Sequence, residues 1–414
     1  MNTLTAILFA LPLLAVPIPF LYARSLSVAK KQELLYKLFC SPLGYYMTLF
    51  ARDPDAVPHR QVRSVNKKDG QVKVVPVPYG EDNYGYIIVN DAVAVVVDPG
   101  GIKIFPGKGV KTTLIYLIVD AHRIQQVLQA EAPNVQLNAI LVTHKHWDHT
   151  AGTASLKSKY KNVKIYGSTM DFSDSWVNWW WKVDHFVNDG ETIVVGDMRF
   201  HVIATPCHTR GSIMYLLEPR HGDTVGQPRQ RSIINSSDDE DDAPVAPHTA
   251  VEDEPSLFTG DTLFIGGCGK YFEGDAVDMY SVIEKLRPLL SAQTLVWPGH
   301  EYAEANLAFA RELEPGNMTL QLKHQEAKDA TYHRYATIPS TWSDESSYNP
   351  YLRIDTRARR GELWRSVLRL AEYEDRKRVE ASVRDKLGDK TESEVAVIIG
   401  LLRILKDGWK GTSA

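Results

Sequence analysis

Several histidine and aspartate residues that could bind metal ions follow apolar, strand-like segments of this sequence. Four of them lie in the sequence THKHWDH, directly after the apolar run AILV: His144, His146, Asp148 and His149. Neutral imidazole and carboxylate groups suit zinc, and a loop at the end of a rigid strand can aim alternate side chains at different points. A solvated polar turn is the alternative for such a cluster taken alone. We interpret THKHWDH as a metal-binding loop.

Three further strand-like segments end in the same residue types. HVIATPCHT contains His208, LFTGD contains Asp261, and LVWPGH contains His300. Alone, either histidine could be a capping or surface residue, and an aspartate after glycine often forms a turn. The repetition of one ligand type at several strand ends favours a shared site.

The number of candidate ligands indicates the chemistry. One catalytic zinc uses about three protein ligands and a water, so these residues exceed its needs and would suffice for two ions sharing a carboxylate and a water. Metal ions lower the pKa of bound water from about 15.7 to about 7, and a hydroxide bridging two ions is therefore a nucleophile at neutral pH. The ions could also polarise a carbonyl group. The sequence predicts a two-metal hydrolase, with zinc as the first choice and iron or manganese as alternatives.

The intervening segments predict an α/β fold. Short apolar runs such as VKVVPVP, AVAVVVDPG, NVKIYG and SIMYLLE read as strands, and helical spacing occurs at Asp120–Ala130, Ala151–Lys159 and Ala276–Leu289. Such alternation is typical of layered sheets flanked by helices. After about residue 303 the strand pattern ends and helical spacing continues to the C-terminus. We expect a catalytic domain at 71–302 and an α-helical domain at 303–414.

Composition excludes some functions. The formal net charge of −4 gives no indication of a nucleic-acid partner. Cys40, Cys207 and Cys268 are too few and too scattered for a disulfide framework, which favours a reducing compartment. We expect Cys207 and Cys268 to be small packing residues near the site.

The N-terminal segment predicts attachment to a membrane. Residues 4–23 carry no charge, and a helix of that length could cross a hydrocarbon layer of about 30 Å. Pro12, Pro17 and Pro19 argue against a regular helix, although membrane spans tolerate proline. Basic residues follow the run, which predicts a cytoplasmic catalytic domain. We expect a single-pass anchor at 1–23 and a basic juxtamembrane stem at 24–70; a cleaved signal and a buried segment are the alternatives.

Two other segments have an unusual composition. Residues 219–256 include SSDDEDDAPVAPHTAVEDE, which is acidic and poor in aromatic residues, so we expect a disordered insertion available to protein partners. The sequence DFSDSWVNWWWKVDHF contains the Trp176–Trp181 cluster. That cluster could form a substrate wall, contact a membrane interface or pack within an extended loop.

The metal-binding motifs resemble those of the metallo-β-lactamase superfamily, and within it the glyoxalase II (hydroxyacylglutathione hydrolase) family. The resemblance runs from about Val72 to the C-terminus and includes EDNYGYII and GGCGKYFEGDA. It implies an αββα sandwich with a C-terminal helical domain and a two-metal site. Its first metal would be bound by His144, His146 and His208, and its second by Asp148, His149 and His300, with Asp261 bridging the two. Asp148 and Asp261 are accordingly the candidate catalytic residues.

The resemblance also implies a substrate. Family members bind the glutathione part of a thioester with positions that match Lys270, Tyr302, Arg403 and Lys406. Cations at such positions suit the carboxylates of glutathione. Phe272 stands where the family has a tyrosine, so one hydroxyl contact is lost. The expected reaction converts an S-acylglutathione and water to an acid and glutathione.

Three alternatives remain at this point. A membrane-tethered scaffold on the same fold, with weak or no hydrolase activity, would use the anchor, the acidic insertion and the tryptophan cluster. A single-iron persulfide dioxygenase is disfavoured by the complete second set of ligands. A two-zinc nuclease is disfavoured by the negative net charge.

Overall fold

The computed structural model describes residues 61–62, 64–66, 72–80, 82–90, 92–100, 102–105, 116–119, 122–218, 254–355, 357–388 and 391–409. The expected anchor at 1–23, most of the stem at 24–70 and most of the acidic insertion at 219–256 lie outside these residues. Within them, no helix combines the length and the apolar character needed to cross a membrane.

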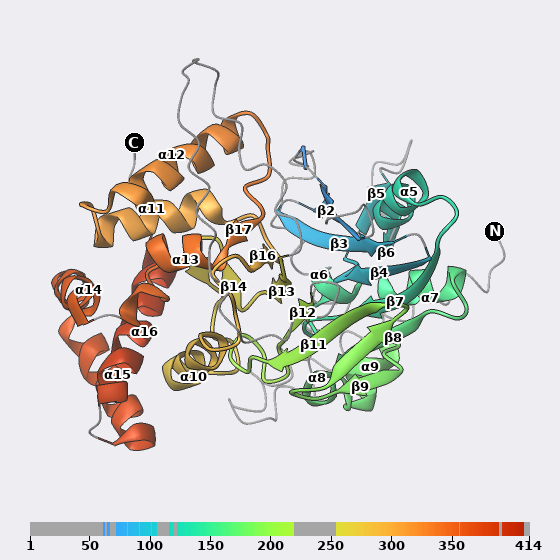
Figure 1. The fold of residues 1–414 in the computed structure, drawn as a ribbon. Helices are drawn as coiled ribbons and strands as arrows, with labels where there is room; N and C mark the ends of the chain where they lie inside the picture. The colour runs from blue at the N-terminus through green and yellow to red at the C-terminus, as the bar shows by residue number, and fades with distance from the viewer. Residues whose placement is uncertain are drawn as a thin grey trace, which may run out of the picture. The chain divides into compact units, whose positions relative to one another are not determined.

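Two β-sheets form the centre of the described part of the chain (Figure 1). The first has the order β1-β2-β3-β4-β7-β8-β9 and the second the order β10-β11-β12-β13-β16-β17. The strands of the first sheet are β1 (Val65–Asn66), β2 (Lys73–Tyr79), β3 (Asn83–Val89), β4 (Val93–Val97), β7 (Gln136–Leu141), β8 (Lys164–Ser168) and β9 (His185–Val187). Those of the second are β10 (Thr192–Val195), β11 (Met198–Ala204), β12 (Ile213–Leu217), β13 (Ser256–Gly260), β16 (Leu295–Pro298) and β17 (Ser340–Thr341).

Parallel pairing places several strand ends at one edge. In the first sheet β4, β7, β8 and β9 run parallel, and in the second sheet β13 and β16 do so. The sequence VAVVV of β4 explains its central position, because β-branched residues that are apolar on both faces favour a strand covered on both sides. The carboxyl ends of parallel strands are the usual place for a ligand site in open α/β sheets.

An aromatic core joins the two sheets. The Tyr86 ring of β3 lies 5.3 Å from the Phe258 ring of β13 and 5.6 Å from the Trp297 ring of β16, measured between centroids. All three residues are almost fully buried. Tilted and edge-on contacts of this kind are favourable for aromatic rings. The two sheets are therefore packed face to face at the level of the strands that lead to the candidate ligands.

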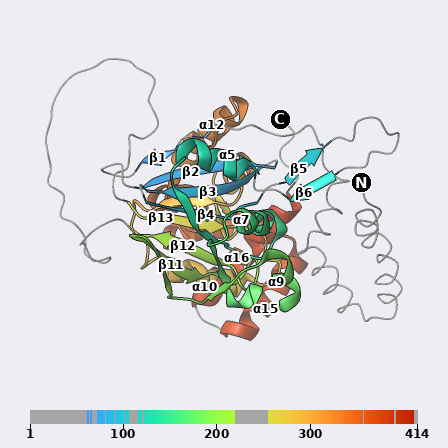
Figure 2. The same ribbon diagram turned by 90° about the vertical axis from the view of Figure 1, so that its right-hand side faces the viewer.

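Helices accompany the first sheet on the side seen in Figure 2, where α5, α7 and α9 lie in front of the strands. Their bounds, with those of two short neighbours, are α5 (His122–Glu131), α6 (Trp147–Thr150), α7 (Thr153–Lys159), α8 (Thr169–Phe172) and α9 (Ser175–Trp181). Two separate two-stranded sheets lie outside the main sheets. One pairs β5 (Ile102–Phe105) with β6 (Tyr116–Val119), and the other pairs β14 (Leu263–Phe264) with β15 (Gly267–Cys268).

The remaining helices pack beside the second sheet and gather at the left of Figure 1. They are α10 (Ala276–Leu286), α11 (Ala303–Leu313), α12 (Met318–Tyr332), α13 (Trp342–Tyr348), α14 (Arg357–Leu370), α15 (Tyr373–Leu387) and α16 (Thr391–Gly408), with the short 3₁₀ helix η2 (Arg353–Asp355). A capping box at Asp275 and Asp278 begins α10 by satisfying backbone N–H groups at its first turn.

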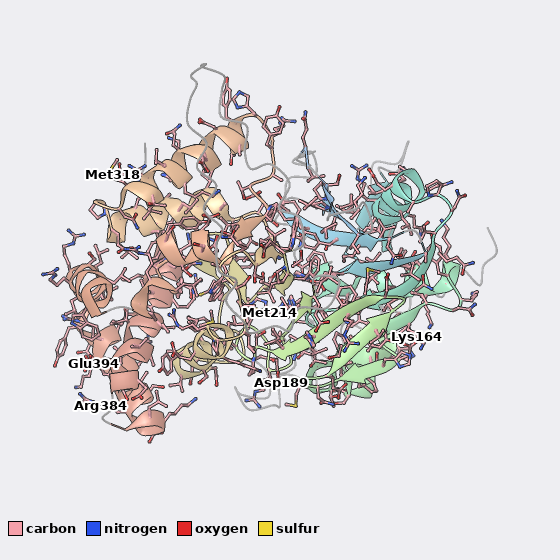
Figure 3. The ribbon with its side chains drawn as sticks, in the orientation of Figure 1. Lys164, Asp189, Met214, Met318, Arg384 and Glu394 are labelled. Atoms are coloured by element: carbon pink, nitrogen blue, oxygen red, sulfur yellow. The ribbon has the colours of Figure 1, made fainter. Side chains whose placement is uncertain are left out.

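A second apolar core lies between these helices and the second sheet. Met214 of β12 and Leu257 of β13 share this cluster with Ile283 of α10 and with Ile398 and Leu402 of α16. Figure 3 shows Met214 inside the body, whereas Met318 of α12 lies at its periphery, in agreement with exposures of 0% and 65%. The C-terminal helices are thus part of the folded unit that carries the site.

The structure agrees with the layered α/β fold and the helical C-terminal region that the sequence predicts. The predicted helices Asp120–Ala130, Ala151–Lys159 and Ala276–Leu289 correspond to α5, α7 and α10. Their ends differ by a few residues because periodicity does not mark where a helix is capped.

Candidate metal centre

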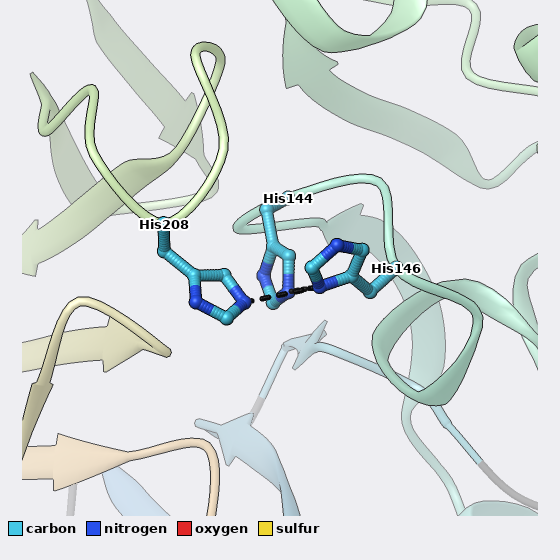
Figure 4. A group of neighbouring side chains, drawn as sticks. All are labelled: His144, His146 and His208. Carbon is cyan, nitrogen blue, oxygen red and sulfur yellow. Dashed lines mark hydrogen bonds between the residues drawn. The ribbon is translucent and has the colours of Figure 1, made fainter. Parts of the chain in front are cut away.

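Three histidines from two loops form the first group of candidate ligands, which we call the first trio (Figure 4). His144 and His146 follow β7, and His208 follows β11. His144 Nε2 lies 2.9 Å from His146 Nδ1, which lies 3.0 Å from His208 Nε2. All three side chains are buried. Three ring nitrogens therefore meet at one point.

A second trio consists of Asp148, His149 and His300. The first two are on α6, and His300 follows β16. His149 Nε2 lies 3.3 Å from His300 Nε2, and His300 Nε2 lies 3.5 Å from Asp148 Oδ2. This group offers two nitrogens and one carboxylate oxygen.

Asp261, which follows β13, lies between the two trios. Its Oδ1 is 3.2 Å from His149 Nε2, and its Oδ2 is 3.2 Å from His300 Nε2 and 3.5 Å from His208 Nε2. Oδ1 is buried and, apart from its 3.2 Å contact with His149 Nε2, makes no hydrogen bond within the described part of the chain. A buried carboxylate oxygen without a hydrogen bond is costly unless another group, such as a cation, satisfies it. The bridging position that the family resemblance implies for Asp261 agrees with this geometry.

The outward ring nitrogens of the histidines have partners of their own. Nδ1 of His149 contacts Asp98 Oδ2 at 2.9 Å, and Nδ1 of His300 contacts Asp82 Oδ1 at 3.0 Å. Nδ1 of His208 contacts the Lys270 carbonyl oxygen at 2.8 Å. A carboxylate or carbonyl oxygen accepts a hydrogen bond from the N–H at that nitrogen, which leaves the other nitrogen's lone pair directed into the site. Metal-binding histidines usually have such outer partners.

His144 is oriented through Thr143. The Thr143 hydroxyl donates to Asp98 Oδ2 at 2.7 Å and lies 3.1 Å from His144 Nδ1. The Thr143 N–H donates to Asp98 Oδ1 at 2.8 Å. Asp98 therefore supports a residue of each trio. Its φ of 47° lies in the left-handed region, where aspartate and asparagine are tolerated better than most residues.

The turn between β2 and β3 joins the two sheets at the site. The Tyr84 N–H donates to the Gly299 carbonyl at 2.8 Å, and the Glu301 N–H donates to the Asp82 carbonyl at 2.7 Å. The Asn83 amide donates to Asp148 Oδ2 at 3.2 Å. A Cβ at Gly299 would lie 2.5 Å from Asp261 Oδ1, so a side chain would collide with the bridging carboxylate. The backbone itself thus fixes the spacing of the second trio.

The first trio is held in the neutral form. Burial lowers the pKa of His144 and His146 well below the ordinary value, and neighbouring histidines lower it further. Burial also lowers the pKa of His208. Neutral imidazole is the form that binds a metal ion.

In the second trio the pKa of both histidines is raised, in contrast to the first trio. Burial disfavours a charge on His149, but Asp261, Asp148 and Asp98 outweigh burial and raise its pKa well above the ordinary value. For His300 the same balance, with Asp261 and Asp82, raises the pKa to about 10. Burial opposes ionisation of Asp261, yet His300 and His149 hold its pKa well below the ordinary value. The carboxylates thus favour positive charge at the second trio, which a divalent cation would supply.

These residues fit two divalent metal ions. The donor set combines imidazole nitrogens with two carboxylates, Asp261 has a buried oxygen without a hydrogen bond, and the outer partners direct the lone pairs inward. His144, His146 and His208 would hold one ion, Asp148, His149 and His300 the other, and Asp261 both.

Two predicted substrate residues lie directly beside the trios. The Lys270 carbonyl contacts His208, and the Lys270 ammonium lies 5.8 Å from the centroid of the Phe272 ring. Phe272 itself packs edge-on against His146 and His208 and is 47% exposed. Tyr302 stacks on His300 at 4.9 Å with an interplanar angle of 4°. Each trio thus has a partly exposed aromatic ring beside it.

The other two predicted substrate residues reach the same segments from α16. Arg403 Nη1 donates to the Cys268 carbonyl at 3.0 Å, two residues before Lys270. Lys406 Nζ donates to the Ala305 carbonyl at 2.7 Å, three residues after Tyr302. Residues three apart on a helix share a face. The structure therefore brings all four predicted substrate residues to the two segments that flank the trios.

The tryptophan cluster and the cysteines lie outside the ligand set. Trp181 is buried, whereas Trp179 is 61% exposed; the side chains of Trp176 and Trp180 lie outside the described side chains. Cys207 and Cys268 are both buried, as expected of packing residues. Burial raises the pKa of both thiols, so neither is prepared to act as a nucleophile.

Sequence reasoning missed the residues that orient the ligands. Asp98 lies at the end of the strand-like run AVAVVVDPG and Asp82 lies in EDNYGYII, but neither pattern predicts a contact with the ligand histidines. An aspartate at the carboxyl end of a buried strand was an available signal for Asp98. No sequence signal could have indicated the Lys270 carbonyl, because every residue has a backbone carbonyl group.

We predict that Asp98→Asn weakens metal binding by about 10- to 100-fold, the usual effect of losing an outer partner. Asparagine tolerates the left-handed backbone, but its amide can leave His149 in the tautomer that carries the proton on Nε2. The measurement is zinc affinity by competition with a chromophoric chelator. Asp184→Asn is the control, because Asp184 likewise accepts a hydrogen bond from a backbone N–H, and its other partner, Lys157, belongs to neither trio. Equal affinities in wild type and Asp98→Asn would contradict the role of Asp98.

Comparison with known proteins agrees with this geometry. The family model of the metallo-beta-lactamase superfamily matches residues 80–221, and that of the hydroxyacylglutathione hydrolase C-terminus matches residues 301–409. The chain is 31% identical to the cytoplasmic hydroxyacylglutathione hydrolase of Arabidopsis thaliana, over 69% of this chain and 89% of that protein. It is 28% identical to the hydroxyacylglutathione hydrolase of Dictyostelium discoideum, over 68% of this chain and 86% of that protein.

Among solved structures, the match to ETHE1 from Myxococcus xanthus covers 72% of this chain and 92% of the ETHE1 chain, with 19% identity and a TM-score of 0.41. This likeness is too distant to bear on function. The sequence relationship is much stronger, because it combines more than 30% identity with nearly the full length of the Arabidopsis protein. The chain belongs to the hydroxyacylglutathione hydrolase (glyoxalase II) family of the metallo-β-lactamase superfamily.

Proposed function

We propose that this chain is a two-metal hydrolase that cleaves S-acylglutathione thioesters to a carboxylic acid and glutathione. The observation that carries the proposal is the convergence of the two trios on Asp261, with ring lone pairs directed inward by outer partners. The family relationship supports the thioester as substrate, since both relatives named above are hydroxyacylglutathione hydrolases. Zinc is the proposed metal because histidine and carboxylate ligands suit it.

Two divalent ions, when bound, would supply a water of lowered pKa and positive charge beside the thioester carbonyl. The chain's own residues would hold that arrangement in place. Asp98 and Asp82 would accept hydrogen bonds from the Nδ1–H groups of His149 and His300, and so leave Nε2 of each ring unprotonated as the ligand atom. No protein nucleophile is needed, which agrees with the burial of both described cysteines.

We propose that glutathione binds between the two segments that carry Lys270 and Tyr302. Lys270, Arg403 and Lys406 would provide positive charge for its carboxylates, and the partly exposed Tyr302 side chain would provide a hydroxyl. Lys406 keeps further N–H donors beyond the one used on Ala305, because an ammonium group has three. Phe272 lacks a hydroxyl, so at that position the glutathione contact would be apolar.

We predict that Asp261→Ala loses metal and hydrolase activity together. The substitution removes the carboxylate shared by both trios and leaves the charges of His149 and His300 without their main partner. Metal content of the purified full chain would fall from about two per chain, and S-lactoylglutathione hydrolysis would fall by at least about 100-fold, the scale expected when a direct catalytic ligand is lost.

Asp329→Ala is the matched control, because Asp329 is an exposed carboxylate on α12. An Asp261→Ala variant that kept both metals and activity would refute the assignment. A wild-type chain with two metals that cleaved no S-acylglutathione would contradict the substrate, and one without metal would contradict the centre itself.

We predict that the KM for an S-acylglutathione rises as the pH passes through about 8. Burial and the neighbouring Arg403 lower the pKa of Lys406 to about 8. Lys406 is therefore charged below that pH and loses its charge above it, so attraction for a glutathione carboxylate is present at pH 7 and lost by pH 9. The loss of one charged hydrogen bond, about 1.5–3 kcal/mol, corresponds to an increase of about 10- to 100-fold.

Steady-state kinetics between pH 6.5 and 9 measure this effect after subtraction of spontaneous thioester hydrolysis. Lys406→Arg stays charged throughout and should keep the low KM at pH 9, whereas Lys406→Met should show the high KM at every pH. Identical pH profiles for wild type and Lys406→Met would exclude Lys406 from substrate binding.

We further propose that residues 4–23 tether the protein to a membrane, with the catalytic region in the cytoplasm. The support is the uncharged apolar run followed by basic residues. The full chain, expressed in cells and fractionated, should remain with membranes after alkaline carbonate washing, and a chain lacking residues 1–23 should not. Release of the full chain by the wash would contradict a membrane-spanning tether.

A further inference from the structure

A buried carboxylate outside the ligand set connects the two loops of the first trio. Asp171 lies on α8, and only 2% of it is exposed. It belongs to neither trio, and neither the motifs nor the family resemblance singled it out. Its contacts nevertheless reach both loops that supply His144, His146 and His208.

On one side Asp171 holds the loop after β7. Its Oδ2 accepts a hydrogen bond from the Lys145 N–H at 3.0 Å, and its Oδ1 forms an ion pair with the Lys145 ammonium at 3.3 Å. Lys145 lies between His144 and His146 in the sequence. The backbone between two ligands of the first trio is thus tied to this carboxylate.

On the other side Asp171 holds the loop after β11. Its Oδ2 accepts a hydrogen bond from the Thr209 hydroxyl at 2.7 Å, and its Oδ1 accepts one from the Gly211 N–H at 3.0 Å. Thr209 directly follows His208. A Cβ at Gly211 would lie 2.5 Å from the Asp171 carboxylate, so the close approach of the loop requires glycine at that position.

Glu273 makes a parallel connection nearer the surface. Its Oε1 pairs with the Lys145 ammonium at 2.7 Å, and its Oε2 accepts from the Arg210 N–H at 2.7 Å. Lys145 is therefore held between two carboxylates, one of them fully buried. Charge-assisted hydrogen bonds of this kind are stronger than neutral ones and more directional than simple packing.

We propose that Asp171 is a positioning residue for the first trio, and that it sets the affinity of that trio for its metal ion without acting on the second trio. The physical reason is that ligand nitrogens from two loops must be held about 3 Å apart, and Asp171 is the buried group that fixes one loop against the other. The second trio has outer partners that Asp171 does not touch, namely Asp82, the turn before β3 and Asp98, which also reaches His144 through Thr143.

Asp171→Asn is the direct test. Asparagine has nearly the same shape but only one acceptor oxygen, so its NH₂ group must face either the Gly211 N–H or the Lys145 N–H in any orientation. An unsatisfied buried donor then displaces one of the loops. We expect one of two zinc ions to bind about 10- to 100-fold more weakly, as for other outer-partner losses, and the second to keep its affinity. The measurement is chelator competition on the purified full chain, with Asp184→Asn as the control.

A double-mutant cycle separates positioning from a general loss of stability. Asp171→Asn should add nothing to His208→Ala, which already removes a ligand of the first trio. In His300→Ala, where the second trio is incomplete, it should weaken the remaining tight binding by the same factor of about 10 to 100. A uniform decrease for both metals, or equal effects in both backgrounds, would overturn the proposal.

If circular dichroism shows that Asp171→Asn does not fold, Thr209→Val provides the test, because it removes a single hydroxyl donor to Asp171. Wild-type affinity for both metals in the Thr209→Val variant would also overturn the proposal. The inference rests on the proposed two-metal function. A wild-type chain that binds fewer than two metals would contradict the proposed function. A wild type with two metals, together with an unaffected Asp171→Asn variant, would contradict only the role of Asp171.

Discussion

The carboxylate of Asp261 between two groups of buried histidines is the interaction on which the site depends. Its charge keeps His149 and His300 protonated when no cation is present, while the first trio stays neutral through burial. Two divalent ions would replace those protons and satisfy the Asp261 oxygen that has no hydrogen bond within the described residues. The same seven side chains therefore explain both how the protein tolerates a buried polar cluster and why that cluster suits metal ions.

Such a cluster needs a rigid surrounding, because ligand atoms only about 3 Å apart leave little room for movement. The rigidity comes from the packing of the two sheets, with the Tyr86 ring against Phe258 and Trp297. It also comes from backbone hydrogen bonds between the turn before β3 and the segment that carries His300. Close-packed interiors resist small displacements, so the sandwich core is a requirement of the site as well as of stability.

The C-terminal helices bring two of the proposed substrate residues toward this centre. One part of α16 contributes Ile398 and Leu402 to the core, and Arg403 and Lys406 reach the segments beside Lys270 and Tyr302. The orientation of the cations therefore depends on the packing of α16 against α10 and the second sheet. The partly exposed Phe272 and Tyr302 rings, each stacked or edge-on against ligand histidines, would place a bound thioester next to both trios.

The sequence by itself determined the candidate ligand residues, because each follows an apolar strand and its type is visible in a short motif such as THKHWDH. It also determined the helical C-terminal region through periodicity. Tertiary structure decided the partners that orient the ligands, since Asp98 and His149 are 51 residues apart and Asp82 and His300 are 218 apart. The Lys270 carbonyl has no signature in any side chain. Asp171 lies between two loops because of where α8 packs. Its partners Lys145 and Thr209 are 26 and 38 residues away in the sequence, and no local pattern encodes contacts over such separations.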